Sequence, residues 1–311
     1  MKSSPPYLVA ILLCTFNGSR FLSEQLNSFE SQTHHSWFVI ASDDGSSDGT
    51  LDILLHYQNK WPTGKLIIRR GPENGFCSNF LSLACDSTIS AVFYAFCDQD
   101  DVWLPSKLST ALSSISHYGV SDKPALYCGR TVYVDEALKK IGASRPYSFP
   151  PNFRNALVQS IAGGNTMVFN SSTKVLLESI GRVQHASHDW WLYQLVTGVG
   201  GIVIYDKEPQ VLYRQHNDAL VGGNTSILQG MERFSAVLKG RFKRWCDVNN
   251  SALFAAEDYF LNENKVTLNL FRLMRAAKFK DRIRLFGVVG LYRQSRLGTI
   301  SLYLAVLLKK V

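Results

Sequence analysis

The densest group of carboxylates in the chain directly follows an apolar segment. Residues 91–96 are entirely apolar, and Asp98, Asp100 and Asp101 come within the next five positions. Side chains two positions apart in an extended segment point the same way, so Asp98 and Asp100 can present two carboxylates to one point. Such charges repel unless a cation lies between them, and Mg²⁺ or Mn²⁺ held by carboxylates usually adds water and substrate phosphates. The pair predicts a divalent metal site, with a helix N-terminal cap at Asp100 or Asp101 as the alternative.

A second group of carboxylates lies in the segment SDDGSSDGT, residues 42–50. Gly45 permits a tight turn, and Asp48 is placed to cap a following helix. The adjacent carboxylates of Asp43 and Asp44 exceed what a cap needs. A carboxylate can accept a hydrogen bond from the N3–H group of uracil or thymine, a donor that cytosine lacks. We therefore expect Asp44 to bind the base of a nucleotide, with Asp43 as the second candidate.

Short apolar runs and helical patterns alternate through the first 130 residues and must position these carboxylates. Strands are expected at residues 8–14, 37–41, 65–69, 91–96 and 125–132, and helices at 21–31, 50–59, 76–84 and 107–117. This alternation predicts an α/β fold of βαβ units with a mostly parallel central sheet. Ligands of such sheets bind beyond the carboxyl ends of the strands, where both acidic groups fall.

The basic residues are concentrated near the C-terminus. The whole chain has a formal net charge of +8, yet residues 231–311 hold 16 Lys and Arg against 6 Asp and Glu, and residues 1–230 hold 17 against 19. We divide the chain into an α/β domain, residues 1–225, and a mostly helical basic region, residues 226–311. The asymmetry predicts an anionic partner for the basic region, and a solvated basic helical face is the alternative.

Residues 269–282, treated as one helix, have two distinct faces. The apolar face consists of Leu270, Leu273, Met274 and Ala277, and the adjoining basic face consists of Arg272, Arg275, Lys278 and Arg282. This pattern is typical of a helix that lies on an anionic bilayer, and a helix packed on the body is the alternative. The uncharged segment 297–308 has 12 residues, which is too short to cross a bilayer.

The cysteines and the N-terminus indicate a cytoplasmic protein. The six cysteines form no CxxC pair, which argues against a zinc site and for reduced thiols. The first apolar run follows Pro5-Pro6 and precedes no small-residue cleavage site, so we expect a strand there and not a signal peptide.

Seven segments in order resemble the family-2 inverting glycosyltransferases, which have a GT-A type nucleotide-binding fold. The resemblance covers about residues 7–225 and is carried by TFNGSRFLSEQLNS, SDDGSSDGT, ENGFCSNF, FCDQDDVWLPSKL, GGNTMVFN, HDWWLYQL and YRQHNDALVGG. The similarity is closest to bacterial rhamnosyltransferases of O-antigen, lipopolysaccharide and related polysaccharide synthesis. That finer similarity rests mostly on DQDDVW, HDWW and YRQH.

The resemblance implies roles for individual residues. The DxD motif for metal and diphosphate is Asp98 and Asp100, and the general base is Asp189. The nucleotide pocket is expected to consist of Thr15, Asn17, Asp44 and Asp98. Contacts to the diphosphate or the metal are expected from Arg214 and His216. The acceptor site is expected at Asn165, Thr166, His188 and Trp190. A packed histidine is the alternative for His188, and Trp191 is expected in the core.

The resemblance also implies a reaction. L-Rhamnose would pass from dTDP-β-L-rhamnose to a saccharide on a polyprenyl lipid, with Mg²⁺ or Mn²⁺, at the cytoplasmic face of the inner membrane. A UDP-hexose donor and an inactive polysaccharide-binding scaffold are the alternatives. A dinucleotide-dependent oxidoreductase is excluded because GxGxxG is missing after the first strand. A sugar nucleotidyltransferase is excluded because its glycine-rich, lysine-containing loop is missing there. No nucleic-acid partner is expected, since no recognised binding module surrounds the basic region.

Overall fold

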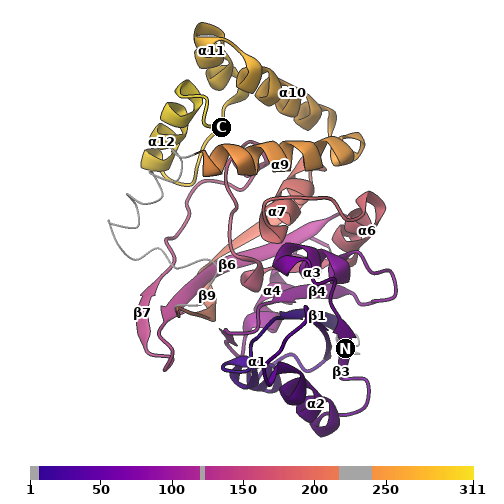
Figure 1. Ribbon diagram of the computed structural model, residues 1–311. Helices are drawn as coiled ribbons and strands as arrows, with labels where there is room; N and C mark the ends of the chain where they lie inside the picture. Colours follow the sequence, from indigo (N-terminus) through magenta and orange to yellow (C-terminus); the bar gives the residue numbers. More distant parts are fainter. Residues whose placement is uncertain (1–6, 120–122, 217–239) are drawn as a thin grey trace.

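Within residues 7–119, 123–216 and 240–311, which the computed structural model describes, nine strands form one curled sheet (Figure 1). The strands are β1 (Val9–Thr15), β2 (Trp37–Asp43), β3 (Leu66–Arg70), β4 (Phe93–Cys97), β5 (Val102–Trp103), β6 (Ala125–Val134), β7 (Lys140–Ala143), β8 (Val168–Asn170) and β9 (Ile202–Arg214). Their order is β3-β2-β1-β4-β8-β6-β9-β5, and β7 pairs with β6. The first apolar run is thus a strand, as predicted, and it lies inside the sheet.

The parallel pairing predicted for the sheet is found in two places. Strands β3, β2, β1 and β4 are all parallel, and β6 is parallel to β9. Strand β8 runs antiparallel to both β4 and β6, and β5 and β7 also pair antiparallel. The α/β prediction is confirmed, and the second half of the sheet is mixed.

Helices cover both faces of the sheet. Those before residue 217 are α1 (Leu22–Glu30), α2 (Thr50–Lys60), α3 (Gly75–Ala84), α4 (Lys107–Ser116), α5 (Phe153–Ala156), α6 (Ser171–Ile180) and α7 (His188–Gly198). Successive strand residues point to opposite faces, so Ile11 and Leu13 pack in the core layer of α1, α2 and α4. Ala10 and Leu12 pack in the layer of α3, α6 and α7. Strands β1 and β4 are therefore buried on both sides, whereas the parallel strands β3 and β9 are partly exposed.

Four helices at the top of Figure 1 form the C-terminal part of the described chain. They are α9 (Arg241–Ala256), α10 (Asn262–Ala276), α11 (Phe279–Val289) and α12 (Arg296–Leu307). Phe242 of α9 stacks on Trp190 of α7, and Leu268 and Leu302 belong to the same core cluster as Leu126 of β6. The helices therefore share a core with the sheet. The boundary predicted at residues 225 and 226 lies outside the described residues.

The single amphipathic helix predicted at residues 269–282 is wrong, because the chain is extended at Ala277 and Lys278 between α10 and α11. Met274 is fully buried in the core, so that part of the predicted apolar face points inward. Two of the predicted basic residues have carboxylate partners: Arg272 pairs with Glu257 at 2.6 Å and Arg275 pairs with Asp247. Helix α10 therefore packs on the body, as the alternative reading proposed.

Candidate active site

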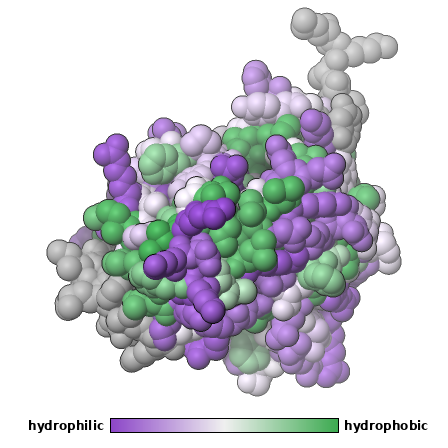
Figure 2. Space-filling view, turned by 90° about the horizontal axis from the view of Figure 1, so that it is seen from above, coloured by the Kyte–Doolittle hydropathy of each residue, from purple (hydrophilic) through white to green (hydrophobic). Residues whose placement is uncertain are grey.

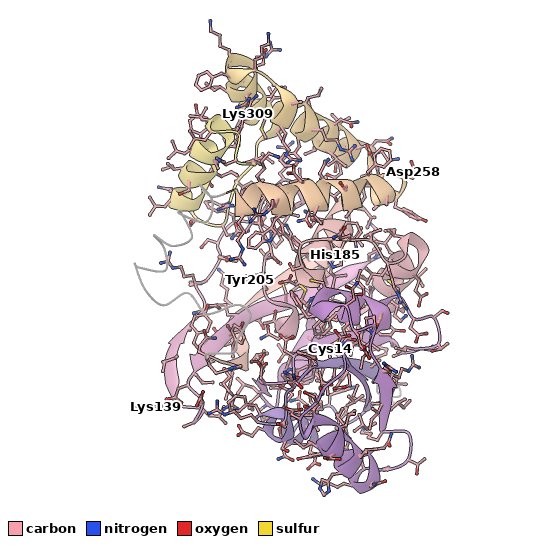
Figure 3. All side chains as sticks on the ribbon, viewed as in Figure 1. Cys14, Lys139, His185, Tyr205, Asp258 and Lys309 are labelled. Atoms are coloured by element: carbon pink, nitrogen blue, oxygen red, sulfur yellow. The ribbon has the colours of Figure 1, made fainter. Side chains whose placement is uncertain are left out.

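The carboxyl ends of β1, β2 and β4 meet at one edge of the sheet. Thr15 lies opposite Asp43, and Leu13 lies opposite Cys97. Cys14, labelled in Figure 3, is the next-to-last residue of β1 and marks this edge. The two acidic groups of the sequence are therefore brought side by side, as parallel pairing requires.

The acidic turn, residues 98–101, connects β4 to β5. Burial and the nearby charges of Asp100 and Asp189 raise the pKa of Asp98 to about 7. The structure therefore brings the predicted base, from the first turn of α7, close to the predicted metal motif. Carboxylates held this close favour a bound cation, since a positive charge stabilises their ionised forms.

Asp100 points toward the end of β9. Its Oδ2 lies 2.9 Å from Nε2 of His216, and its carbonyl oxygen accepts a hydrogen bond from Nε of Arg214 at 2.9 Å. The other ring nitrogen of His216, Nδ1, is buried and has no hydrogen-bond partner within the described part of the chain. His216 thus lies beside the predicted metal motif, and its contact with a diphosphate or a metal stays a prediction.

Asp98 and Asp100 could together bind a divalent cation through one or two carboxylates. Asp98 and Asp100 supply hard oxygen donors. Burial and the charges of Asp100 and Asp189 raise the pKa of Asp98, and a bound cation would stabilise its ionised form. In the ranges that the structure describes, no group of three or more His, Cys, Asp or Glu side chains could hold a metal ion. One or two carboxylates suit Mg²⁺ or Mn²⁺, because the remaining positions are then left to water and phosphate oxygens.

Asp101 points into the protein. It is fully buried and accepts hydrogen bonds from Nδ2 of Asn165 at 2.5 Å and from the backbone N–H of Arg214 at 3.2 Å. Burial and the charges of Asp100 and Asp98 raise its pKa well above the usual value. Asp101 therefore anchors the acidic turn. Asn165, predicted to bind the acceptor, holds this anchor with its amide nitrogen.

Arg214 is fully buried under the acidic turn. Its guanidinium donates to a carboxylate oxygen of Glu24, to the carbonyl oxygen of Glu136 and to the carbonyl oxygen of Asp100. The Phe21 ring lies over it, with the ring centroid 4.3 Å from Cζ. Arg214 thus stabilises the acidic turn through its hydrogen bond to the carbonyl oxygen of Asp100. Its contact with a diphosphate stays a prediction.

The two carboxylates at the end of β2 hold loops. Asp43 accepts hydrogen bonds from Oγ1 of Thr15 at 2.8 Å and from the N–H and hydroxyl of Ser46. Asp44 accepts from the backbone N–H groups of Glu73, at 2.6 Å, and Gly75, at 3.0 Å. Asp44 thus orders the loop before α3, and a nucleotide base would have to share or displace these donors. Base recognition by Asp44 stays a prediction.

Gln99 connects the nucleotide side of the site to the acidic turn. Its amide accepts from the N–H of Phe16 at 2.8 Å and donates to the carbonyl oxygen of Phe16 at 3.0 Å. Asn17 has a positive φ of 48°, and its Oδ1 accepts from the N–H of Ser47 at 2.9 Å. Sequence reasoning missed Gln99, because the two residues that it connects are 83 positions apart.

Asp189 lies in the first turn of α7. Its Oδ1 accepts a hydrogen bond from the backbone N–H of Trp190 at 2.7 Å. Burial raises its pKa, and hydrogen bonds from Ser187 and Ser160 oppose that shift. A helix N-terminus favours the carboxylate form, so Asp189 combines a raised proton affinity with an anion-stabilising position. That combination suits a general base.

His188 is packed in an aromatic cage. Its ring stacks on Phe80 with a centroid distance of 4.0 Å and meets Phe96 edge-on at 4.9 Å. Burial and the nearby His185 lower its pKa to about 3. The backbone at Gly164 is so close that a Cβ there would lie 2.2 Å from Nε2. His188 is thus a core residue, as the alternative reading held, and its burial does not support contact with an acceptor.

Trp190 and Thr166 are also buried. The indole Nε1 of Trp190 donates to the carbonyl oxygen of Ala156 at 2.6 Å, and its ring packs on Phe242. The hydroxyl of Thr166 donates to the carbonyl oxygen of Gly163 at 2.8 Å. These contacts place both side chains in the core, and neither offers an open surface to a sugar. Trp191 is fully buried, as predicted.

Lys107 is a further charged group behind the acidic turn that sequence reasoning missed. It is fully buried at the start of α4, its Nζ lies 3.1 Å from the centroid of the Trp103 ring, and burial lowers its pKa to about 7. Nζ has no hydrogen-bond partner among the described residues. The signal for it was a lysine on the apolar face of a predicted helix.

Solved structures share this fold. Staphylococcus aureus TarS with UDP matches with a TM-score of 0.56 and 14% identity, over 97% of this chain and 88% of that one. TarS with UDP-GlcNAc matches at 0.53 and 16%, over 91% and 80%. The mannosyltransferase PcManGT of Pyrobaculum calidifontis, with GDP-Man and Mn²⁺, matches at 0.52 and 16%, over 99% and 88%. The chain therefore has the GT-A type fold of these glycosyltransferases.

Curated relatives point to the same kind of enzyme. The dTDP-rhamnosyl transferase RfbG of Shigella flexneri is 28% identical over 90% of this chain and 100% of its own length. An Escherichia coli enzyme, UDP-Glc:alpha-D-GlcNAc-diphosphoundecaprenol beta-1,3-glucosyltransferase WfgD, is 28% identical over 37% of this chain and 44% of its own. The family model for glycosyl transferase family 2 matches residues 10–177, which is more than half of the chain and includes the acidic turn. The chain therefore belongs to glycosyl transferase family 2.

Proposed function

We propose that this glycosyltransferase moves L-rhamnose from dTDP-β-L-rhamnose to a saccharide acceptor, with inversion at the anomeric carbon. The observation that carries the proposal is the packing of the start of α7 on β4, where His188 meets Phe96 at 4.9 Å, so that Asp189 and the metal and diphosphate motif belong to one site. The charge of Asp189 accordingly adds to the raised pKa of Asp98. A reaction that joins an acceptor hydroxyl to a nucleotide sugar needs both groups in one place.

Asp189 would act as the general base of a single displacement. It takes the proton from the acceptor hydroxyl while that oxygen forms a bond to the anomeric carbon, and the bond from that carbon to the diphosphate oxygen breaks. Positioned general bases contribute about 10²–10⁴ in rate. One displacement turns the β-linked donor into an α-L-rhamnoside.

The leaving nucleoside diphosphate carries negative charge that the site must stabilise. Asp98 and Asp100 would hold Mg²⁺ or Mn²⁺, which supplies electrostatic stabilisation of that charge when bound. His216 lies 2.9 Å from Asp100 and so borders the same position. Thr15, Asn17 and Asp44 would hold the nucleoside at the ends of β1 and β2.

A UDP-hexose donor is the second candidate beside dTDP-rhamnose. The dTDP-rhamnosyl transferase RfbG spans most of this chain, but at 28% identity. The glucosyltransferase WfgD, named for a UDP-Glc donor, matches a shorter part at the same identity. Its name includes a diphosphoundecaprenol-linked sugar, which supports a lipid-linked acceptor in cell-surface polysaccharide synthesis for this chain too. A cytoplasmic enzyme that is peripheral at the inner membrane would meet such an acceptor.

A thermal-shift panel tests the donor and the metal together. We would compare dTDP, UDP, GDP and NAD, each with and without Mn²⁺, on the wild type and on Asp100→Ala. A ligand that binds only the native state stabilises it by about 2.7 kcal/mol at 100 times its Kd. We expect a shift with dTDP and Mn²⁺ that exceeds the shift with UDP and that is lost in the variant.

Other outcomes are equally informative. A preference for UDP would keep the glycosyltransferase and replace rhamnose by a UDP-linked hexose. A shift of equal size in Asp100→Ala would remove that residue from the metal site. No shift with any nucleotide would favour an inactive saccharide-binding scaffold.

A further inference from the structure

Helix α12 is apolar on two sides, and only one side is covered. Leu302, Ala305 and Val306 are buried against the body. Leu297, Ile300 and Leu304 are 77%, 57% and 43% exposed, and their spacing places them on one face of the helix. Leu308, just after the helix, continues this face and is 55% exposed. We call these four residues the outer α12 face. A helix that is apolar all round is normally buried all round, and no residue in the described part of the chain covers this face.

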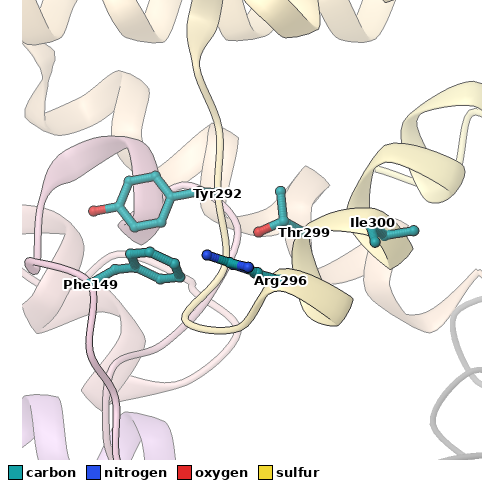
Figure 4. A pocket seen from close by; sticks show the side chains of 5 residues that line it. All are labelled: Phe149, Tyr292, Arg296, Thr299 and Ile300. Atoms are coloured by element: carbon teal, nitrogen blue, oxygen red, sulfur yellow. The ribbon is translucent and has the colours of Figure 1, made fainter.

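An apolar hollow adjoins the outer α12 face. It has a volume of about 340 Å³ and is lined by Phe149, Tyr292, Arg296, Thr299 and Ile300 (Figure 4). The rings of Phe149 and Tyr292 meet edge-on at 6.0 Å, and Arg296 lies beside them. The hollow thus offers an apolar recess with a cation at its side.

The surroundings of the outer α12 face are strongly basic. Residues 278–311 contain eight Lys and Arg and a single acidic residue, Asp281. The exposed cations of this stretch are Lys278, Lys280, Arg284, Arg296 and Lys309. Figure 2 views the molecule from this end and shows apolar patches among hydrophilic side chains, and Figure 3 places Lys309 among the uppermost helices. Apolar side chains with cations around them match an anionic lipid surface.

Arg282 of α11 connects the C-terminal end of α12 to the body. Arg282 is buried, and its Nη1 donates to the carbonyl oxygens of Val306 and Leu307 at 3.3 and 3.2 Å. Its other nitrogen, Nη2, donates to the carbonyl oxygen of Ala277. This side chain satisfies carbonyl groups at the C-terminal end of α12 and fixes α12 to α11.

We propose that the outer α12 face docks this protein on an anionic phospholipid bilayer. The leucine and isoleucine side chains enter the boundary between head groups and acyl chains, and the surrounding Lys and Arg meet lipid phosphates. A second copy of the chain fits less well, because it would bring the same cations into contact. The inference rests on the proposed function, since an acceptor on a polyprenyl lipid brings the active site to a membrane. In this proposal α12, and not the helix predicted at residues 269–282, contacts the membrane.

Sedimentation with lipid vesicles tests the proposal on the full chain. We would compare vesicles of phosphatidylcholine alone with vesicles that also contain phosphatidylglycerol, at low salt. The test variant is Leu297→Ser with Leu304→Ser, and the matched control is Leu51→Ser with Leu55→Ser, two exposed leucines of α2. We expect wild type and control to sediment with the anionic vesicles and the test variant to partition about tenfold less.

Three results would overturn the proposal: no sedimentation of wild type with anionic vesicles, equal sedimentation of the test variant, or a lipid-free dimer that the test variant dissociates. The last would assign the face to a second copy. Binding of dTDP and Mn²⁺ in solution should be the same in wild type and test variant. If the wild type binds anionic vesicles but does not bind dTDP with Mn²⁺, the result would contradict the proposed function and would still support membrane docking by the outer α12 face.

Discussion

The aspartates near the C-terminal ends of the parallel strands differ in the hydrogen bonds that their carboxylates accept. Asp43, Asp44 and Asp101 accept hydrogen bonds from loops or from neighbouring side chains, and they hold the site in shape. Only burial and neighbouring charges shift the pKa of Asp98, whereas Asp189 accepts hydrogen bonds from the N–H of Trp190 and from Ser187 and Ser160. A carboxylate without internal donors is free to meet a ligand. In our proposal Asp98 meets the metal, and the hydrogen-bonded aspartates also order the loops around the site.

The sequence predicted the two groups of aspartates, but it could not predict which of these side chains face the site and which are anchored inside the protein. Asp100 and Asp101 are adjacent and chemically identical, yet one borders His216 and the other is anchored by Asn165. Their separation depends on the direction of the turn after β4 and on residues more than 60 positions away. The sequence predicted a packed His188 only as an alternative and did not predict the burial of Trp190, since the partners that bury both side chains come from other elements.

The pKa of Asp98 predicts a pH effect on stability. Because the folded-state pKa, about 7, exceeds the usual 3.8, ionisation in the folded protein is unfavourable. The stability that protonated Asp98 contributes is complete below pH 3.8 and is lost as the pH rises toward 7. Asp98→Asn stays neutral, so in metal-free protein its free energy of unfolding should gain on that of wild type by roughly 2–3 kcal/mol between pH 5 and pH 8.

Urea unfolding in EDTA at both pH values would measure this gain. Asp281→Asn, at an exposed acidic residue of α11, is the matched control and should show no such change with pH. A gap between Asp98→Asn and wild type that stays constant from pH 5 to pH 8 would contradict the raised pKa.

At the scale of elements, the sequence predicted best those strands that appear as short, continuous apolar runs. The expected strands at residues 8–14, 37–41 and 91–96 match β1, β2 and β4 within two residues at either end. Local patterns missed the short β8 and the break between α10 and α11. No Gly or Pro marks that break, and Arg282 binds the carbonyl oxygen of Ala277 there from a neighbouring helix. Tertiary contacts of this kind override helical propensity.

The short 3₁₀ helix Gly164–Thr166 and α7 fit together through one close contact. A Cβ at Gly164 would lie 2.2 Å from Nε2 of His188, and the stacked Phe80 leaves that ring little room to move. Gly164→Ala should therefore destabilise the protein by about 1–3 kcal/mol. In a His188→Ala background the same substitution should cost much less, because the obstructing ring is gone.

A double-mutant cycle by urea unfolding would measure the coupling. We expect a coupling free energy of about 1 kcal/mol or more between the two sites. Strictly additive effects would show that Gly164 and His188 do not restrict one another.

At the scale of the whole molecule, the site is assembled from the full length of the domain. Arg214, at the end of β9, donates to Glu24 of α1 and to the carbonyl oxygen of Asp100, and Gln99 pairs with the backbone of Phe16. The C-terminal helices add Phe242 to the core behind α7 and so support the element that carries Asp189. Within the described residues, no helix is both long and apolar enough to cross a membrane. The exposed apolar side chains of the outer α12 face and the Lys and Arg around them are our proposed membrane contact.

The most direct test of the proposed mechanism compares Asp189→Asn with wild type in two assays. One measures binding of dTDP with Mn²⁺ by calorimetry, and the other measures transfer of labelled sugar from dTDP-rhamnose to lipid-linked saccharide. Asparagine keeps the shape of the side chain and cannot take the proton. We expect nucleotide binding to be unchanged and transfer to fall by about 10²–10⁴. Transfer near the wild-type rate would contradict the assignment of Asp189 as the base, and with it our account of this site.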